Sequence, residues 1–251
     1  MLDIWPGYED AVGQRWVVVP GTIRAIAEVD AGVAERVFGS SDAIVLGGWP
    51  GATTGQAWAS SARFAEDVET GSIPKVVRVA MYDPENWEQT PLAERLDPHG
   101  SIEAFCALAR SNGYFVLITP HANLVSVPES IYAPRARETR EEAFLRSGIV
   151  EVSAANADAV ETQPQKMLRD PPAYRAFVEA TARLAREVKP DVQVMSGLST
   201  HPGYPATTEM LRSAWTSVRD IVDGHYLSLG RHRRLPDVAA AFLSETLRTR
   251  D

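Results

Sequence analysis

KVVRVAMYDPENWEQTP, residues 75–91, is an apolar stretch that runs directly into a polar one. Its first half is rich in β-branched residues, which favours a buried strand that reaches Met81. Pro84 interrupts this strand, because proline has no N–H to donate to a sheet and biases Asp83 before it towards extended geometry. The residues that gather where the strand ends are Tyr82, Asp83, Glu85 and Trp87. Folds that alternate strands and helices place their functional sites at such strand ends.

The same order, a short apolar strand followed by an amphipathic helix, recurs along the chain. The predicted strands are 15–20, 43–46, 75–82, 114–119, 149–154, 192–195 and 221–229. The predicted helices are 22–37, 56–70, 97–112, 137–146, 172–188, 207–218 and 237–249. Strict alternation indicates parallel strands joined by right-handed crossovers. Strands that are apolar on both faces also fit a sheet covered by helices.

The length of the chain favours closure of this sheet into a barrel. The chain has 251 residues, 45% of them hydrophobic, and a barrel of eight strand–helix units typically takes about 250 residues. The sequence therefore predicts an α/β fold, a (β/α)8 TIM barrel, as one domain over residues 1–251. Seven strand–helix units are clear, so the sequence allows a closed barrel of eight or an irregular one, and an open doubly wound sheet is the alternative.

Charge and targeting signals limit the partners. The formal net charge of -8 disfavours nucleic acid and anionic membranes. The basic cluster Arg231-His232-Arg233-Arg234 is short and is interpreted as a solvated loop. The first residues, MLDIWPGYED, show no export signal, and no run of about 18 apolar residues occurs. We therefore expect a cytoplasmic protein that acts on a small molecule, with its oligomeric state left open.

Three single residues allow specific structural predictions. Cys106 is the single cysteine, so an internal disulfide is impossible, which fits a reducing compartment. Its helical surroundings predict a small core residue rather than a nucleophile. Gly71 and Gly113 each follow a predicted helix and precede a strand, so both are expected to adopt a positive φ as C-caps.

Asp83, Glu85 and His121 are the candidates for acid/base catalysis. Hydrolysis of a glycoside needs two carboxyl groups in different environments, one protonated and one ionised. Asp83 and Glu85 lie two residues apart beyond the strand, so their side chains are expected to point the same way. His121 follows Pro120 at the end of another strand, in a position suited to a general base. The structural alternative is that Asp83 caps a turn and Glu85 pairs with an arginine.

A second set of residues at predicted strand ends is expected to bind the substrate. Its members are Trp49, Tyr82, Trp87, Asn123, Asn156, Ser196, Ser199, His225 and Tyr226. The aromatic members would form the apolar wall that sugars or apolar ring systems need. The segment 196–199 does not form the G-x-S-x-G pattern of a serine hydrolase. No HxH, HExxH or CxxC spacing occurs, so neither a metal nor a cofactor is predicted.

Four motifs at or near strand ends are distinctive. They are Tyr82-Asp83-Pro84-Glu85-Asn86-Trp87 with Thr90-Pro91, Gly47-Gly48-Trp49, Gly197-Leu198-Ser199-Thr200 and Val222-Asp223-Gly224. With them the chain resembles, over residues 15–230, a group of mostly uncharacterised bacterial TIM-barrel proteins that are loosely glycoside-hydrolase-like. The resemblance implies the barrel and carries no catalytic assignment to single residues. Members of the group tend to end the fifth strand with glutamines, where this chain has Ser153-Ala154-Ala155-Asn156, and the DxxDxDxE run of family 18 chitinases is absent.

The sequence leaves three functions open. The first is a cofactor-independent enzyme that acts on a small organic, glycoside-like molecule through carboxylate and histidine acid/base chemistry. The second is a cyclase, lyase or isomerase of a biosynthetic pathway, which would use the same acidic and aromatic residues to protonate a substrate or shelter a cation. The third is a barrel without catalytic activity that binds carbohydrate or a protein.

Overall fold

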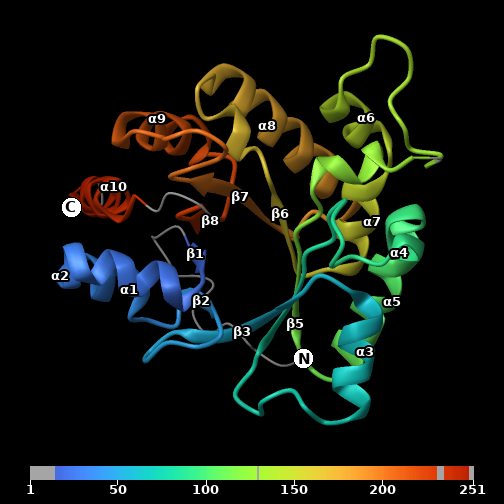
Figure 1. Cartoon of the computed structure of the whole chain (residues 1–251), viewed down its shortest axis with the longest axis horizontal. Coiled ribbons are helices and arrows are strands. Elements are labelled where there is room, and N and C mark those ends of the chain that lie inside the picture. The colour runs from blue at the N-terminus through green and yellow to red at the C-terminus, as the bar shows by residue number, and fades with distance from the viewer. Residues whose placement is uncertain (1–14, 129, 231–234, 249–251) are drawn as a thin grey trace. The chain divides into compact units, whose positions relative to one another are not determined.

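The computed structural model describes residues 15–128, 130–230 and 235–248, and its eight strands close into a barrel in chain order (Figure 1). The strands are β1 (Arg15–Val18), β2 (Ala43–Leu46), β3 (Thr53–Trp58), β4 (Val79–Tyr82), β5 (Phe115–Ile118), β6 (Ala159–Thr162), β7 (Gln193–Ser199) and β8 (Gly224–Ser228). The α-helices are α1 (Pro20–Val29), α2 (Ala31–Phe38), α3 (Ser61–Glu69), α4 (Leu92–Leu96), α5 (Pro98–Ser111), α6 (Arg140–Arg146), α7 (Ile149–Asn156), α8 (Pro171–Val188), α9 (Thr208–Val218) and α10 (Pro236–Arg248). The predicted (β/α)8 TIM barrel is therefore confirmed. The N-terminal MLDIWPGYED and the basic cluster at 231–234 lie outside the described residues.

Contacts within the chain group it into two compact units. The first unit comprises 1–55, 164–179 and 195–251, and the second comprises 56–163 and 180–194. Three of the four boundaries fall inside β3, α8 and β7, so these elements contribute to both units, and the fourth lies just after β6. Each unit contains its own cluster of buried aromatic side chains.

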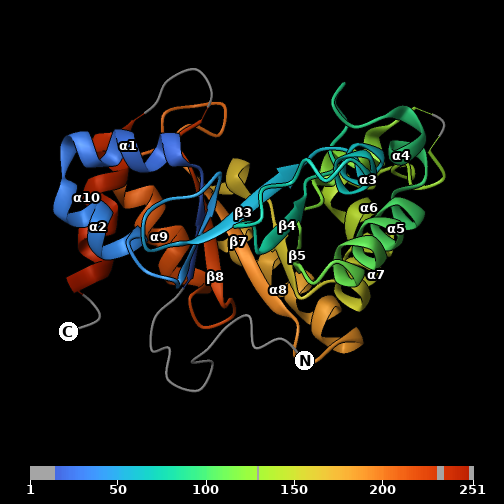
Figure 2. The ribbon, with the colours of Figure 1, turned by 90° about the horizontal axis from the view of Figure 1, so that it is seen from below.

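In the first unit, helices α1, α2 and α10 lie side by side, with α9 next to α10 (Figures 1 and 2). Trp16 of β1 packs edge-on against two of these helices. Its ring centre lies 6.5 Å from that of Phe38 in α2 and 6.1 Å from that of Phe242 in α10. Pairs of this geometry stabilise a core beyond the area they bury. Trp16 therefore points from its strand into the helical layer.

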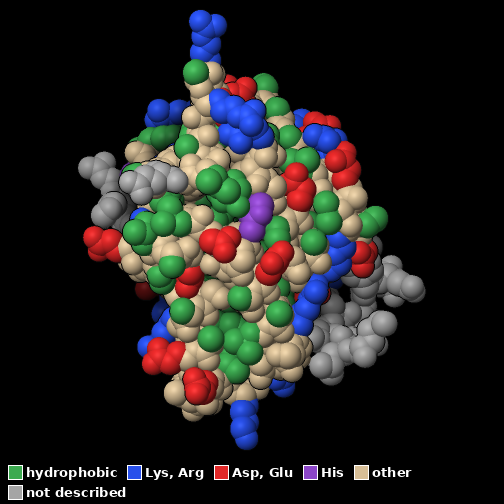
Figure 3. Space-filling model, turned by 90° about the vertical axis from the view of Figure 1, so that its right-hand side faces the viewer, with side chains coloured by type: hydrophobic (Ala, Val, Ile, Leu, Met, Phe, Trp, Pro, Cys, Tyr) green, Lys and Arg blue, Asp and Glu red, His purple; other side chains and the backbone are tan. Residues whose placement is uncertain are grey.

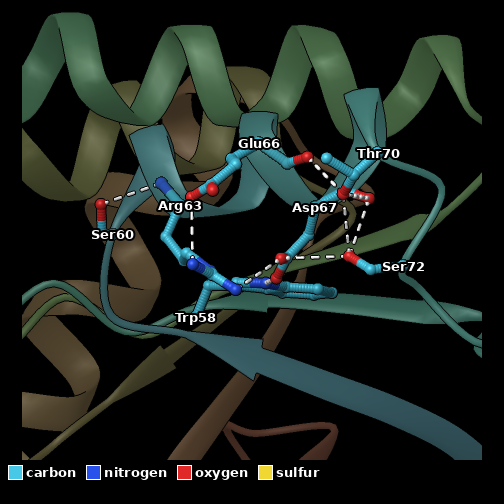
Figure 4. Close-up of polar contacts among 7 residues, drawn as sticks. All are labelled: Trp58, Ser60, Arg63, Glu66, Asp67, Thr70 and Ser72. Carbon is cyan, nitrogen blue, oxygen red and sulfur yellow. Dashed lines mark hydrogen bonds and ion pairs between the residues drawn. The ribbon is translucent and has the colours of Figure 1, made fainter.

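In the second unit, Trp58 links the end of β3 to α3 by an aromatic contact and by a hydrogen bond, and Figure 4 shows the hydrogen bond. Trp58 lies 4.7 Å from Phe64 between ring centres, and its indole N–H donates to Asp67 at 2.8 Å. This hydrogen bond, more than the nearby Arg63, holds the pKa of Asp67 below its usual value. Ser72 adds a further donor to the same carboxylate at 3.1 Å.

Glu94 of α4 joins three elements of the second unit through one buried carboxylate. It accepts hydrogen bonds from the Ser60 hydroxyl at 2.8 Å, the Ser61 N–H at 2.9 Å and the Ala62 N–H at 3.0 Å. These donors form the first turn of α3, where backbone N–H groups lack partners within the helix. The Tyr82 hydroxyl of β4 donates to the same carboxylate at 2.8 Å. Glu94 therefore fixes α3 relative to β4 and the helix that follows it.

Three predicted boundaries were wrong. The helix predicted over 56–70 begins at Ser61, and the residues before it form β3, a strand whose polar sequence TTGQAW carries no apolar run. The strand predicted from Lys75 starts only at Val79, and Val76 is exposed. The helix predicted over 22–37 is divided at Asp30, whose side chain accepts the Val33 N–H and starts α2.

The strand predicted over 149–154 is also wrong, because this segment is helix α7. Its apolar and β-branched residues pack against α5 and α6 instead of entering the sheet. The sixth strand is β6, ten residues further on, and Gln163 follows it directly. The sequence was expected to lack a glutamine at the end of this strand, at Ser153-Ala154-Ala155-Asn156. That expectation referred to residues that form the end of helix α7 and not a strand end.

Acidic, basic and apolar side chains are interspersed on the face of the molecule that Figure 3 shows. In the described part of the chain, no helix combines the length and the apolar character that a membrane span requires. Cys106 is buried in α5, as predicted for a core residue, and burial raises the pKa of its thiol to about 12.

The two predicted glycine C-caps are confirmed, with φ of 65° at Gly71 and 76° at Gly113. A Cβ at Gly71 would meet no atom within 4 Å, so only backbone strain opposes substitution there. Gly71→Ala is expected to lower the free energy of unfolding by about 1 kcal/mol. Gly71→Asn should cost less, because asparagine tolerates left-handed backbone. Denaturant titration of both variants tests this, and equal losses would contradict it.

Candidate active site

The candidate site is built on the adjacent ends of β4, β5 and β6, which all belong to the second unit. The register pairs Tyr82 with Ile118, and Ile118 with Val160. One residue further along each strand, Asp83, Thr119 and Glu161 form a row. Side chains alternate along a strand, and Tyr82 points into the helical layer, where it stacks on Phe105 of α5 at 4.9 Å. The row of Asp83, Thr119 and Glu161 therefore points to the opposite, inner face of the sheet.

Asp83 is held in place by two neutral donors on neighbouring strands. The Thr119 hydroxyl and the Gln163 side-chain amide donate to the same carboxylate oxygen, Oδ1, at 2.8 and 3.0 Å. The same Gln163 nitrogen donates to the Thr119 carbonyl at 2.7 Å. Three strand ends thus position one carboxylate, as a catalytic group requires.

Three residues of this site were not predicted from the sequence: Glu161 and the two donors to Asp83, Thr119 and Gln163. The side chain of Glu161 is 2% exposed, and its Oε1 has no hydrogen-bond partner. Burial raises the pKa of Glu161 well above its usual value, and the nearby carboxyls of Asp83 and Glu85 raise it further. The sequence could have indicated Glu161, since it follows two apolar residues in Ala159–Thr162. It was not selected because the strand was predicted at 149–154 instead.

The segment after β4 is organised by Thr90, which is fully buried. Its hydroxyl oxygen accepts the Glu85 N–H at 3.2 Å and the Trp87 indole N–H at 2.8 Å. Glu85 and Trp87 are both half-buried. The predicted proximity of Asp83 and Glu85 is consistent with their common influence on Glu161.

His121 lies in a short chain of hydrogen bonds at the end of β5. Its Nδ1 accepts the Asn123 N–H at 2.9 Å, and Asn123 Oδ1 accepts the Asn86 N–H at 2.9 Å. In the neutral ring the proton therefore sits on Nε2. Nδ1 is therefore occupied by the Asn123 N–H, and the role of His121 in acid/base catalysis stays a prediction.

Tyr82 was predicted to bind substrate at the strand end, and the structure places it elsewhere. It is fully buried, it stacks on Phe105, and its hydroxyl donates to Glu94. Burial, reinforced by Glu94, raises the pKa of its phenol. The reason is the alternation of the strand, which gives Asp83 the inner face and Tyr82 the helical one.

Ser196 and His225 in the first unit were also predicted to face the substrate, and both point into the helical layer. They pair in register with each other, and His225 pairs with Trp16. Ser196 Oγ lies 2.9 Å from His225 Nδ1 and accepts the Tyr174 hydroxyl of α8 at 3.2 Å. Burial lowers the pKa of His225 to about 3. This group is a neutral, buried hydrogen-bond cluster.

The remaining predicted binding residues divide between the units. Asn156 ends helix α7 and donates to the Val152 carbonyl at 2.9 Å, so the reason for placing it at a strand end no longer holds. In the first unit, Trp49 lies in the loop after β2, and Ser199 Oγ accepts the His201 N–H at 3.1 Å. Alternation places Tyr226 on the face opposite to His225. That all these residues line one mouth with Asp83 stays a prediction.

Within the described residues, no three histidine, cysteine, aspartate or glutamate side chains are arranged to hold a metal ion.

No family model and no curated protein matches the chain. Among solved structures, the chain is similar to a proposed alpha-L-fucosidase from Bacteroides thetaiotaomicron, with 14% identity, a TM-score of 0.47 and 75% of this chain covered. The match spans 59% of that protein, less than two thirds of its length. A fucosyltransferase mutant of the alpha-L-fucosidase AlfC is matched over 99% of this chain and 98% of its own, at 8% identity and a TM-score of 0.31. Similarities of this size establish neither a family nor an activity for this chain.

The raised pKa of Glu161 predicts how stability depends on pH. The folded state keeps the Glu161 proton to higher pH than the unfolded state does. The stability that this bound proton contributes is therefore fully present below the usual pKa of 4.5, and it is lost as pH rises through the pKa of the folded state. Glu161→Gln cannot lose a proton. Its stability relative to the unmodified protein is therefore expected to increase as pH rises, and thermal unfolding across pH measures this.

Glu94→Gln is the matched control for Glu161→Gln. Glu94 is also buried, but its carboxylate accepts four hydrogen bonds, and a glutamine amide would oppose some of the donors. This variant should be less stable than the unmodified protein at neutral pH, by at least about 2 kcal/mol. If the two substitutions changed the free energy of unfolding by the same amount at each pH, the contrast between the hydrogen-bonded carboxyl of Glu94 and the unpartnered oxygen of Glu161 would be contradicted.

The lowered pKa of His225 predicts the opposite pH dependence. The unfolded chain binds the proton first, near pH 6.5, whereas the folded state resists it until about pH 3. The stability that this neutral histidine contributes is therefore present above pH 6.5 and is lost as pH falls, by up to about 1.4 kcal/mol per pH unit. His225→Gln should reduce the acid-side slope by that amount, and an unchanged slope in denaturant titrations would show that His225 is protonated in the folded state.

Proposed function

We propose that this protein is an enzyme that hydrolyses a glycoside-like bond in a small organic molecule by carboxylate acid/base chemistry. The observation that carries the proposal is the presence of two unlike carboxyls at the ends of β4 and β6, on either side of β5. Glu161 is buried and favours its protonated form, whereas Asp83 accepts two hydrogen bonds. One protonated and one ionised carboxyl are the groups that glycoside hydrolysis requires.

In this mechanism Glu161 acts as the general acid. It donates its proton to the oxygen of the leaving group as the bond to the sugar-like carbon breaks. Asp83, positioned by Thr119 and Gln163, orients the attacking water or stabilises the positive charge that develops on the carbon. Water supplies the hydroxyl and the proton of the products, so the reaction needs no cofactor.

Two further residues have supporting roles in the proposal. His121, with its proton on Nε2, is suited to donate a hydrogen bond to a substrate hydroxyl. The Trp87 indole, fixed by Thr90, offers the type of apolar surface on which sugar rings pack. Glu85 contributes negative charge that favours the protonated form of Glu161.

Turnover measurements on a panel of aryl glycosides and underivatised glycosides test this function. Glu161→Gln and Asp83→Asn are expected to lower kcat on any substrate that the unmodified protein hydrolyses by about 100-fold or more. The rate of the unmodified protein should fall as pH rises through the raised pKa of Glu161, because only the protonated acid is active.

Glu103→Gln, on the exposed surface of α5, is the matched control and should retain full turnover. Full activity of both site variants would refute the carboxylate mechanism. A product with the same mass as its substrate would refute hydrolysis and identify the reaction of a cyclase or isomerase.

A further inference from the structure

Three described residues of the second unit have a buried polar side-chain atom without a hydrogen-bond partner: Arg95, Glu151 and Glu161. Arg95 and Glu151 are half-buried, whereas Glu161 is buried among carboxyls. It is almost completely buried, its Oε1 accepts no hydrogen bond, and the charges that act on it are the carboxyls of Asp83 and Glu85. Buried polar atoms in folded proteins nearly always have a partner, so an unpartnered one in a group of carboxyls points to a ligand. Glu94, buried in the same unit, shows the satisfied alternative with four donors.

We propose that the inner face formed by the ends of β4, β5 and β6 binds a small organic cation, a protonated amine or related nitrogen base, at the Oε1 atom of Glu161. This inference rests on the site of the proposed function. An ammonium N–H supplies the donor that Oε1 lacks, and its positive charge offsets the repulsion between Glu161, Asp83 and Glu85.

Three observations favour an organic cation over a metal ion. No three acidic, histidine or cysteine side chains in the described ranges are arranged as metal ligands. Asp83 Oδ1, which already accepts from Thr119 and Gln163, is committed to neutral donors. The segment that carries Glu85 also carries the half-buried Trp87, and an indole is the aromatic group that attracts organic cations best.

Binding of the cation is coupled to a proton. A carboxylate attracts an organic cation much more strongly than a neutral carboxyl does, so binding of the cation favours loss of the Glu161 proton. The neutral acid and a free monocation then give a carboxylate–cation pair and one released proton. The charge distribution of this pair matches the moment in the proposed reaction at which Glu161 has given its proton to the leaving group and positive charge has developed on the substrate.

The test follows the carboxyl carbon of Glu161 by NMR in protein labelled with ¹³C-glutamate, with Glu161→Gln identifying the signal. Titrations are compared in methylammonium chloride, piperidinium chloride and sodium chloride at equal ionic strength, and with neutral acetamide. The midpoint of Glu161 is expected to lie at lower pH in the two organic salts than in sodium chloride, and acetamide should have no effect. Asp83→Asn should reduce this change in the Glu161 midpoint, because the substitution removes one of the charges that attract the cation.

The carboxyl signal of Glu103, on the exposed surface of α5, is the internal reference for effects that the salts have on any exposed side chain. The proposal is overturned if the titration midpoint of Glu161 lies at the same pH in the organic salts and in sodium chloride. It is also overturned if a further titration in magnesium chloride lowers the midpoint more than the organic salts do, which would identify a metal site. The titration involves no turnover. If organic cations lower the Glu161 midpoint but no glycoside is hydrolysed, the proposed function is refuted and the cation site stands. If glycosides are hydrolysed but organic cations do not change the midpoint, the cation site is refuted and the proposed function stands.

Discussion

The alternation of side chains along the barrel strands is the constraint on which the rest of this structure depends. Neighbouring residues on a strand point to opposite faces, so a shift of one position exchanges the helical layer for the inner face. Tyr82 and Asp83 illustrate this: the first stacks on Phe105 and the second meets Thr119 and Gln163. The register between strands then aligns Asp83 with Thr119 and Glu161. A site made of residues from three separate segments results from this one geometric rule.

Two buried glutamates of the second unit show how surroundings decide the role of a residue. Glu94 accepts four hydrogen bonds and joins α3 to β4, so its burial contributes to stability. Glu161 has an unpartnered oxygen and two carboxyl neighbours, so its burial opposes ionisation. Structures tolerate such unfavourable arrangements mainly where function requires them. The contrast is the physical basis for our proposal that Glu161 acts in the chemistry, whereas Glu94 joins elements of the scaffold.

The cluster of Ser196, His225 and Tyr174 in the first unit shows the same principle for a histidine. Burial in the helical layer keeps His225 neutral, and the hydroxyl of Ser196 satisfies its ring nitrogen. A serine beside a histidine is also the beginning of a nucleophilic pair, but here both side chains are covered by helices. Their position in the fold makes them part of the core.

The sequence by itself determined the fold and one part of the site. Alternating apolar strands and amphipathic helices, with the length of the chain, predicted the barrel, and Pro84 marked where β4 ends and Asp83 begins the polar segment. These signals are local, so no tertiary contact is needed to read them. The backbone conformation of single residues could also be predicted from the sequence, because glycine adopts a positive φ readily after a helix, as at Gly71.

Only the tertiary structure decided which residues share a face and which carboxyl is buried. The segment 149–156 has the composition of a strand, yet packing against α5 makes it a helix, and the true strand at Ala159–Thr162 is too short to outweigh it in sequence. The position of Glu161 depends on that choice, and its raised pKa depends on burial and on Asp83 and Glu85, which lie more than seventy residues away in the chain. Burial and charge proximity are properties of three-dimensional packing, and no local pattern encodes them.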